Sequence, residues 1–165
     1  MMWFENIEIG GKRDLGTYTF TESEIIAFAK KYDPQVFHID PEAAKASMYG
    51  GLIASGWHTA AVWMKMAIAD RERTRPEDHP LGSSTVSPGF EDMRWLKPVR
   101  PGMTLRFTAE TIDKIELRSR PELGLVKWRN EARDESGALV FSFIGKGLVS
   151  RNPAGIHALR RHGPA

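Results

Sequence analysis

An aspartate and a histidine, Asp33 and His38, stand five positions apart across a proline. Carboxylate and imidazole side chains are common proton donors and acceptors in enzymes, so a pair held at close range can grip one water between an acid and a base. Taken singly, Asp33 is more typical of a turn or cap before Pro34 than of a catalytic group, and His38 is typical of a polar loop. The pair becomes a candidate catalytic site because of the elements around it.

The flanking sequence predicts a short ordered loop between two helices. Thr21 and Glu24 form a capping-box pattern that indicates the start of the first helix. Pro34 disfavours helical backbone at Asp33, so this helix should end there. Asp40 is followed by a proline, a pattern that predicts the N-cap of the next helix. The aspartate and the histidine are therefore expected between two helix ends.

A longer apolar helix is predicted from about residue 55 to residue 70, with apolar residues almost all the way round. Such a helix is normally enclosed on most sides. Residues 71–88 are polar and predict a long surface loop, and alternating patterns then predict strands at 105–110, 126–133 and from 139. An antiparallel sheet wrapped around one apolar helix satisfies this α+β order, since each buries the other's apolar face. Other α+β arrangements also fit.

Three segments resemble the MaoC-like acyl dehydratases, also called (R)-specific enoyl-CoA hydratases. Residues 32–40 look like the hydratase loop of that family, residues 50–56 like its glycine-led start of the central helix, and residues 94–102 like its strand with a Pro-Val-x-Pro-Gly turn. The resemblance implies a single hotdog domain, a sheet wrapped around one long central helix. We expect that domain over residues 1–150, followed by a basic C-terminal tail at 151–165.

The resemblance also implies roles for residues of this chain. Asp33 and His38 would supply the acid and the base for hydration of a trans-2-enoyl thioester, with the order left open because their protonation is coupled. The backbone N–H of Gly56 would stabilise the oxyanion. The chain departs from the family pattern twice: Ser55 replaces a histidine found in many members, and Met64 replaces a serine.

Further residues are candidates for contacts with the substrate. The acyl group would meet Trp57, Trp63 and Met64, although core packing explains these residues as well. Thr59 or His58 could supply the polar contact that Met64 lacks, while His58 is otherwise expected as a buried histidine with a satisfied partner. Phosphates of coenzyme A would meet basic residues near the predicted turn, and solvated strand-end charges explain these equally well. The candidates are Arg94, Lys97 and Arg100.

The composition of the chain limits the classes of partner and cofactor that we expect it to bind. The chain has 165 residues, a formal net charge of +2 and no cysteine, which predicts no nucleic-acid binding and excludes disulfides and thiolate chemistry. No signal peptide or membrane-spanning segment is visible, so a cytoplasmic protein without a membrane partner is expected. No metal-ligand spacing or dinucleotide motif occurs, and we expect no metal and no cofactor beyond the coenzyme A of an acyl-CoA substrate.

The resemblance implies an enoyl-CoA hydratase, a hydro-lyase of fatty acid metabolism that adds water reversibly and syn to a trans-2-enoyl-CoA. The alternatives are a thioesterase on the same fold and a non-catalytic acyl-thioester-binding subunit. A thioesterase would want a carboxylate on the central helix, and residues 55–69 contain none. A lone hotdog unit leaves a sheet edge and one side of its helix uncovered, so a homodimer or larger homo-oligomer is expected.

Overall fold

The computed structural model describes residues 3–74 and 86–152. After a 3-10 turn at Phe4–Asn6, the helices are α1 (Glu22–Tyr32), α2 (Val36–Ile39), α3 (Pro41–Ala44) and α4 (Gly56–Arg73). The strands are β1 (Lys12–Thr19), β2 (Val86–Trp95), β3 (Thr104–Glu116), β4 (Leu123–Arg133) and β5 (Leu139–Ser150). Within these residues they form one antiparallel sheet in the order β1-β3-β4-β5-β2.

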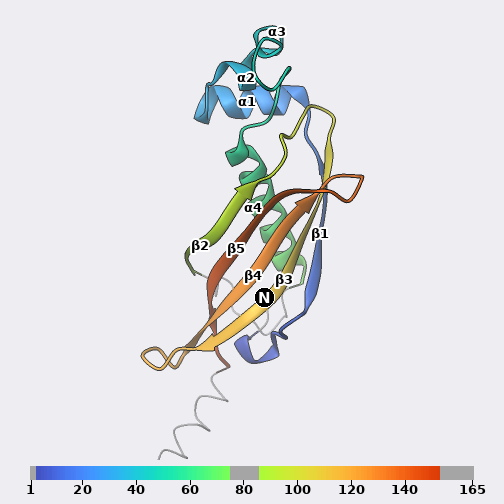
Figure 1. Ribbon diagram of the computed structural model, residues 1–165. Helices are drawn as coiled ribbons and strands as arrows, with labels where there is room; N and C mark the ends of the chain where they lie inside the picture. The colour runs from blue at the N-terminus through green and yellow to red at the C-terminus, as the bar shows by residue number, and fades with distance from the viewer. Residues whose placement is uncertain (1–2, 75–85, 153–165) are drawn as a thin grey trace, which may run out of the picture.

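The sheet curves around α4, which runs along one of its faces (Figure 1). Register shifts interrupt each of the four strand pairings, and such bulges bend a strand and increase its twist. One bulge lies at Gly16, whose φ of 102° is open to glycine and strained for other residues. A Cβ at Gly16 would lie 3.0 Å from the Cε of Met66, so β1 and α4 approach closely there. This arrangement is the hotdog fold, as predicted.

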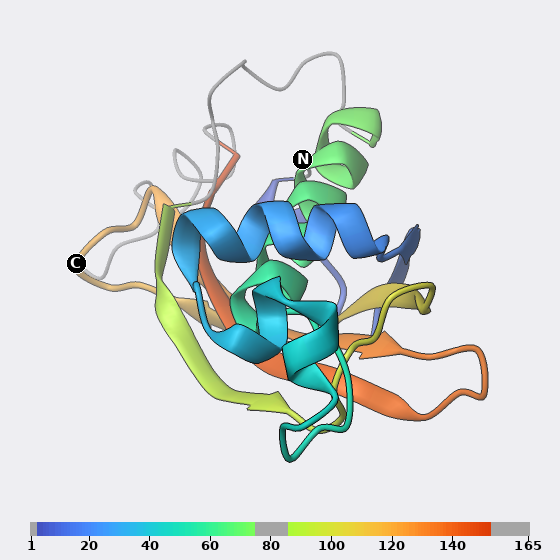
Figure 2. The same ribbon diagram turned by 90° about the horizontal axis from the view of Figure 1, so that it is seen from above.

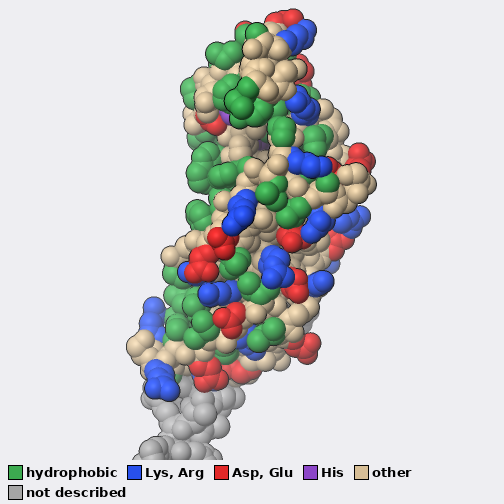
Figure 3. Space-filling model, viewed as in Figure 1, with side chains coloured by type: hydrophobic (Ala, Val, Ile, Leu, Met, Phe, Trp, Pro, Cys, Tyr) green, Lys and Arg blue, Asp and Glu red, His purple; other side chains and the backbone are tan. Residues whose placement is uncertain are grey.

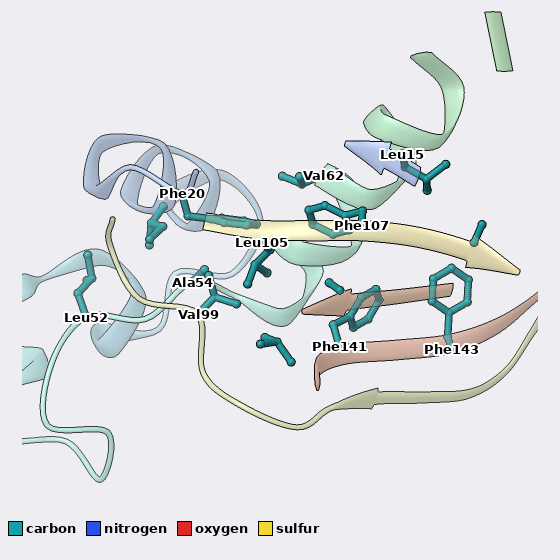
Figure 4. Packing of buried hydrophobic residues seen from close by; sticks show 14 of the residues in the cluster. Leu15, Phe20, Leu52, Ala54, Val62, Val99, Leu105, Phe107, Phe141 and Phe143 are labelled. Atoms are coloured by element: carbon teal, nitrogen blue, oxygen red, sulfur yellow. The ribbon is translucent and has the colours of Figure 1, made fainter. Parts of the chain in front are cut away.

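The core lies between α4 and the concave face of the sheet (Figure 4). The predicted alternation on β3 is confirmed, since Leu105, Phe107 and Ala109 are all buried. Phe141 of β5, on the same sheet, and Val62 of α4, from the opposite side of the core, join the same cluster. Burial of one such large side chain stabilises the fold by about 1.5–3 kcal/mol. The sheet therefore packs its concave apolar face against the buried side of α4.

The outer face of the sheet carries interspersed charges of both signs (Figure 3). Glu91 of β2 pairs with Lys127 and Lys146, and Arg129 pairs with Glu110 across two neighbouring strands. Exposed pairs of this kind contribute little to stability. This face is an ordinary solvated surface.

The expectation that α4 is enclosed on most sides is wrong. Thr59 and Val62 are buried, but Trp57, Met64 and Ile68 are 56%, 45% and 43% exposed. Within the described residues one sheet covers one side of the helix, and α1 crosses only its first turns, so the opposite side stays open. We call this open face the outer stripe; its residues are Trp57, Ala61, Met64 and Ile68. The helix also runs on to Arg73, past the loop start predicted at residue 71.

The short helices sit over the N-terminal end of α4 (Figure 2). The capping box of α1 is confirmed, because Thr21 Oγ1 accepts from the Glu24 N–H and the Glu24 carboxylate accepts from the Thr21 N–H, both at 3.3 Å. Asp40 caps α3 by accepting two backbone N–H groups at 3.0 Å. The predicted loop between them differs in one respect: it contains the single turn of α2. Of the predicted tail, residues 153–165 lie outside the described part of the chain.

Candidate active site

Two helix ends bring Asp33 and His38 together. Asp33 is the C-cap of α1, and His38 lies in α2, where the turn after Pro34 points its ring back toward α1. Oδ2 of Asp33 and Nε2 of His38 are 3.4 Å apart. The carboxylate side chain is 20% exposed and the imidazole 5%, so the pair lies at the bottom of an opening rather than on the open surface.

The imidazole of His38 has a defined orientation. Its Nδ1 lies 2.8 Å from the carbonyl oxygen of Ile53, which can only accept, so Nδ1 carries the hydrogen. The N–H of Ile53 donates in turn to the carbonyl of Phe37 at 3.0 Å, which ties α2 to the segment before α4. In the neutral ring, Nε2 therefore presents its lone pair toward Asp33. This is the nitrogen that can accept a proton from a bound water.

Two hydrogen bonds hold the Asp33 carboxylate. Ser55 Oγ donates to Oδ2 at 2.7 Å, and Gln35 Nε2 donates to Oδ1 at 2.8 Å. Burial raises the pKa of Asp33, but the hydrogen bonds from Ser55 and Gln35 and the nearby His38 outweigh it and lower that pKa below its ordinary value. The carboxylate is therefore ionised at neutral pH. Oδ2 of Asp33 and Nε2 of His38 then face each other as two hydrogen-bond acceptors. One water can donate a hydrogen bond to each of them.

The N-terminus of α4 lies beside the Asp33–His38 pair. Gly56 is the first residue of the helix, and its N–H forms no hydrogen bond within the described residues, whereas the Trp57 N–H donates to Ser55 Oγ at 3.2 Å. A free N–H at a helix N-terminus, together with the macrodipole, favours negative charge. The predicted donor is thus available beside the pair.

Close packing against Trp95 requires a glycine at position 56. A Cβ at this position would lie 2.7 Å from Nε1 and Cε2 of Trp95, a separation that real Cβ atoms do not show. Trp95 Nε1 donates to the carbonyl oxygen of Gly56 at 2.8 Å, which holds the ring there. The indole of Trp95 therefore fills the space that a Cβ at Gly56 would need.

A cavity of about 530 Å³ connects these groups, within the usual size range of small-molecule sites. Its polar end holds the candidate catalytic groups, and aromatic and aliphatic side chains form most of its walls. Residues of the wall include Phe37, Tyr49, Trp57, Trp95, Leu96, Val99, Val140 and Phe141. One end can therefore carry out proton transfer while the rest holds an apolar ligand.

The predicted contact residues fall into two groups. Trp57 and Thr59 line the cavity, and so does Lys97, whose Nζ lies 3.4 Å from Oδ2 of Asp134. Trp63 instead packs edge-on against Phe143, with ring centroids 4.5 Å apart.

The other three candidates lie away from the cavity. Met64 lies on the outer stripe, two turns beyond Trp57 on the same face of α4, so its thioether does not reach the cavity wall. Arg100 donates to the carbonyl oxygen of Tyr49 at 2.6 Å. Arg94 lies 3.9 Å from Asp92 on the edge strand. In this structure neither arginine reaches the cavity wall.

Sequence reasoning gave no site role to Ser55 or Gln35. Ser55 was noted only as a departure from a family pattern, and its contact with Asp33 joins residues 22 positions apart. A polar residue directly before a helix glycine indicates an N-cap. That pattern does not reveal that the Ser55 hydroxyl also contacts Asp33. Gln35 lies two positions after Asp33, a spacing typical of a local side-chain contact, which was the available clue.

His58 also differs from expectation. It is buried, but its Nδ1 has no hydrogen-bond partner within the described residues. Its ring instead stacks on Phe28, with centroids 4.6 Å and planes 7° apart, and meets Phe20 edge-on. Burial lowers the pKa of His58, and the charge of Glu24 opposes this only in part. His58 is a neutral packing residue of α4, held between Phe28 of α1 and Phe20, which follows β1.

Neither a metal site nor a membrane span is evident in the part of the chain that the structure describes. No group of three or more histidine, aspartate or glutamate side chains there could hold a metal ion. None of the described helices is long and apolar enough to cross a membrane.

Comparison with known proteins gives consistent matches. A family model described as a MaoC like domain matches residues 4–131. The uncharacterized protein YdeM of Bacillus subtilis is 33% identical over 106 residues, which are 64% of this chain and 69% of that protein. The MaoC-like dehydratase structure from Rhodospirillum rubrum is 32% identical, with a TM-score of 0.80, and covers 93% of this chain and 99% of its own.

A more distant match adds a likeness of fold. The unliganded (R)-hydratase PhaJ1 from Pseudomonas aeruginosa has a TM-score of 0.68 and 21% identity over 90% of this chain and 86% of its own.

Proposed function

The chain belongs to the MaoC-like dehydratase family, and from this premise we propose that it is a hydro-lyase that adds water reversibly to a trans-2-enoyl-CoA. The observation that carries the proposal is the pairing of Asp33 Oδ2 with the free Nε2 of His38 across 3.4 Å, at the polar end of an apolar cavity. A water that donates to both atoms keeps its oxygen lone pairs free for attack. Hydration of an enoyl thioester needs one group to take a proton from water and one to deliver a proton to carbon, and this pair can serve both needs.

The proton steps follow from the resting state of the pair. An imidazole holds a proton better than a carboxylate near neutral pH, so Nε2 of His38 takes a proton from the water as its oxygen bonds to C3. The electrons of the C2=C3 bond move toward the thioester oxygen. Nε2 then returns the proton to C2, so that one water is added and both groups regain their starting state. The Asp33 carboxylate orients the water and stabilises the imidazolium between the two steps.

The developing negative charge needs donors that are already in place. In the proposal the thioester oxygen lies at the N-terminus of α4 and accepts from the N–H of Gly56, where the helix macrodipole adds to the effect. Removing one such donor in other enzymes lowers turnover by about 10²- to 10³-fold. The helix start and the catalytic pair lie on the same cavity, which supports this placement.

The remaining cavity residues suit a flexible apolar thioester. Trp57 and its aromatic neighbours would contact the acyl or pantetheine chain, and Thr59 would offer a hydroxyl in place of the polar group absent at Met64. Lys97 at the rim is the basic side chain placed to meet a phosphate of coenzyme A. The coenzyme enters as part of the substrate, and no other cofactor is proposed.

Two other functions fit the same fold. A thioesterase would want a carboxylate from the central helix, but the buried Asp70 of α4 is paired with Arg13 and Arg73 and does not line the cavity. A non-catalytic acyl-thioester binder would use the cavity without the pair. Crotonyl-CoA discriminates among the three: loss of enoyl absorbance without release of free thiol supports hydration. Thiol release would indicate a thioesterase, and binding with neither change would indicate a binder.

We further propose that a second copy of the chain covers the outer stripe. The stripe is apolar and exposed. One of the two edge strands of the described sheet, β2, presents Val86, Phe90 and Trp95 at 67%, 54% and 44% exposure. Green side chains gather along the β2 side of the molecule (Figure 3). An apolar face next to an unpaired strand edge is suited to an isologous contact between two copies.

A further inference from the structure

Ser55 is a fully buried hydroxyl, 0% exposed, that contacts Asp33 and α4 at the same time. Its Oγ donates to Oδ2 of Asp33 at 2.7 Å and accepts from the N–H of Trp57 at 3.2 Å. A hydroxyl has one hydrogen to donate, and here that hydrogen is committed to the carboxylate. The oxygen atom that receives it is the one that faces His38.

The two hydrogen bonds on Asp33 differ in their setting. Gln35, which holds Oδ1, is an exposed side chain, and a solvent-exposed hydrogen bond competes with water. The Ser55 contact is shielded from solvent, where a charge-assisted hydrogen bond is stronger. Ser55 is therefore the buried anchor of the carboxylate.

We propose that Ser55 is a positioning residue for the reaction: it keeps Oδ2 of Asp33 facing Nε2 of His38 and ties the carboxylate to the helix start that presents the Gly56 N–H. The inference rests on the proposed hydratase function. In this arrangement the water-binding pair and the oxyanion donor keep their relative positions because one hydroxyl links them. An N-cap serine alone would stabilise α4 without affecting the chemistry of Asp33.

The electrostatic consequence gives the inference a readout beyond stability. Burial raises the pKa of Asp33, and the Ser55 hydrogen bond is the largest of the effects that lower it again. Without that hydrogen bond the carboxyl must take up a proton at higher pH. The acid limb of the pH–rate profile reports the coupled pair, and it moves in the same direction whichever member of the pair binds the proton first.

The test compares Ser55→Ala with the matched variant Ser47→Ala. Ser47 Oγ also donates, at 2.6 Å to the carbonyl of Ala44, and also accepts from an N–H two residues on, at 3.2 Å, but it touches no carboxylate. We expect Ser55→Ala to lower kcat for crotonyl-CoA hydration by about 10- to 100-fold with little change in KM. Its acid limb should move to higher pH, because the carboxylate of Asp33 loses the hydrogen bond that lowers its pKa. Ser47→Ala should leave kcat and the acid limb unchanged.

Two outcomes overturn the inference. If Ser55→Ala lowers stability but leaves the acid limb in place, Ser55 is a helix cap and no more. If Ser55→Asn, which restores a capping side chain, recovers stability and full turnover without restoring contact with the carboxylate, the same conclusion holds.

A second measurement separates this inference from the proposed function. Carboxyl carbon NMR follows the titration of Asp33 directly in the wild type and in Ser55→Ala, and it requires no turnover. An inert wild type in which Ser55→Ala still raises the pKa of Asp33 would remove the hydratase proposal and keep the anchoring contact. An unchanged Asp33 titration in an active enzyme would remove the role of Ser55 alone.

Discussion

Trp95 and Gly56 fit together across the end of β2 and the start of α4. The indole Nε1 donates to the Gly56 carbonyl at 2.8 Å, and the same ring lies 2.7 Å from the position of a Cβ on that residue. Gly56 has none of the positive φ values found at other glycines of the chain. Space, rather than backbone conformation, is therefore what requires a glycine here.

Gly56→Ala should force the Trp95 ring away and move the first turn of α4. We expect a loss of about 1–3 kcal/mol in the free energy of unfolding, measured in urea, together with a fall in turnover as the N–H shifts. Combining Gly56→Ala with Trp95→Leu should recover most of the stability. A penalty that persists beside the smaller side chain would show that the ring is not the obstacle.

His58 should make stability depend on pH. Because burial lowers its pKa in the folded protein, the unfolded chain binds a proton first below about pH 6.5, and stability falls as the pH falls further. His58→Phe can keep the stack on Phe28 but cannot titrate. Its Tm should therefore drop less than that of the wild type between about pH 7 and pH 5.

A second substitution separates the loss of the titrating group at position 58 from changes in packing. His58→Leu should flatten the same pH dependence, even if its Tm is lower at every pH. Parallel curves for all three proteins would mean that His58 does not bind the destabilising proton.

Thr59→Val tests the hydroxyl at the cavity wall. Thr59 is only 1% exposed and lines the cavity. If the hydroxyl contacts the substrate or the reacting water, the variant should lose about 5- to 30-fold in kcat/KM. Thr111→Val, at a buried position outside the cavity, is the matched control and should keep the native value. Equal kinetics for both variants would leave Thr59 a packing residue.

Met64→Lys tests the outer stripe as a contact between copies of the chain. A charge in the middle of a buried apolar interface is unfavourable, so the variant should sediment as a smaller species than the wild type. Met48→Lys is the control, because Met48 is 90% exposed and lies outside the stripe. A wild type that is monomeric at all concentrations, or a Met64→Lys variant that assembles normally, would contradict this use of the stripe.

Local signals in the sequence predicted much of the framework. The capping box at Thr21 and Glu24, the cap at Asp40 and the alternation of Leu105 and Phe107 each depend on neighbours within a few positions, and each is confirmed. These features follow from backbone hydrogen bonding and from the two-residue period of a strand. They set where helices and strands begin and end, and they place Asp33 at the C-terminal end of α1.

Contacts between distant segments were not predictable in the same way. The apolar pattern of α4 cannot tell a face covered by the sheet from one left open, so Met64 and its stripe were assigned to the interior. The Ser55 contact with Asp33 depends on how α1 lies across α4, and the lone Nδ1 of His58 depends on the rings packed around it. Each is decided by tertiary packing, which periodicity does not report.

The most direct test of the catalytic pair is the initial rate of crotonyl-CoA hydration by the wild type, Asp33→Asn, His38→Gln and the double variant. Circular dichroism should confirm that all four are folded. We expect each single variant to lose about 10²- to 10⁴-fold in turnover. The double variant should be little worse than either, because the two groups act as a unit. Near-wild-type rates in both single variants would contradict the assignment of Asp33 and His38.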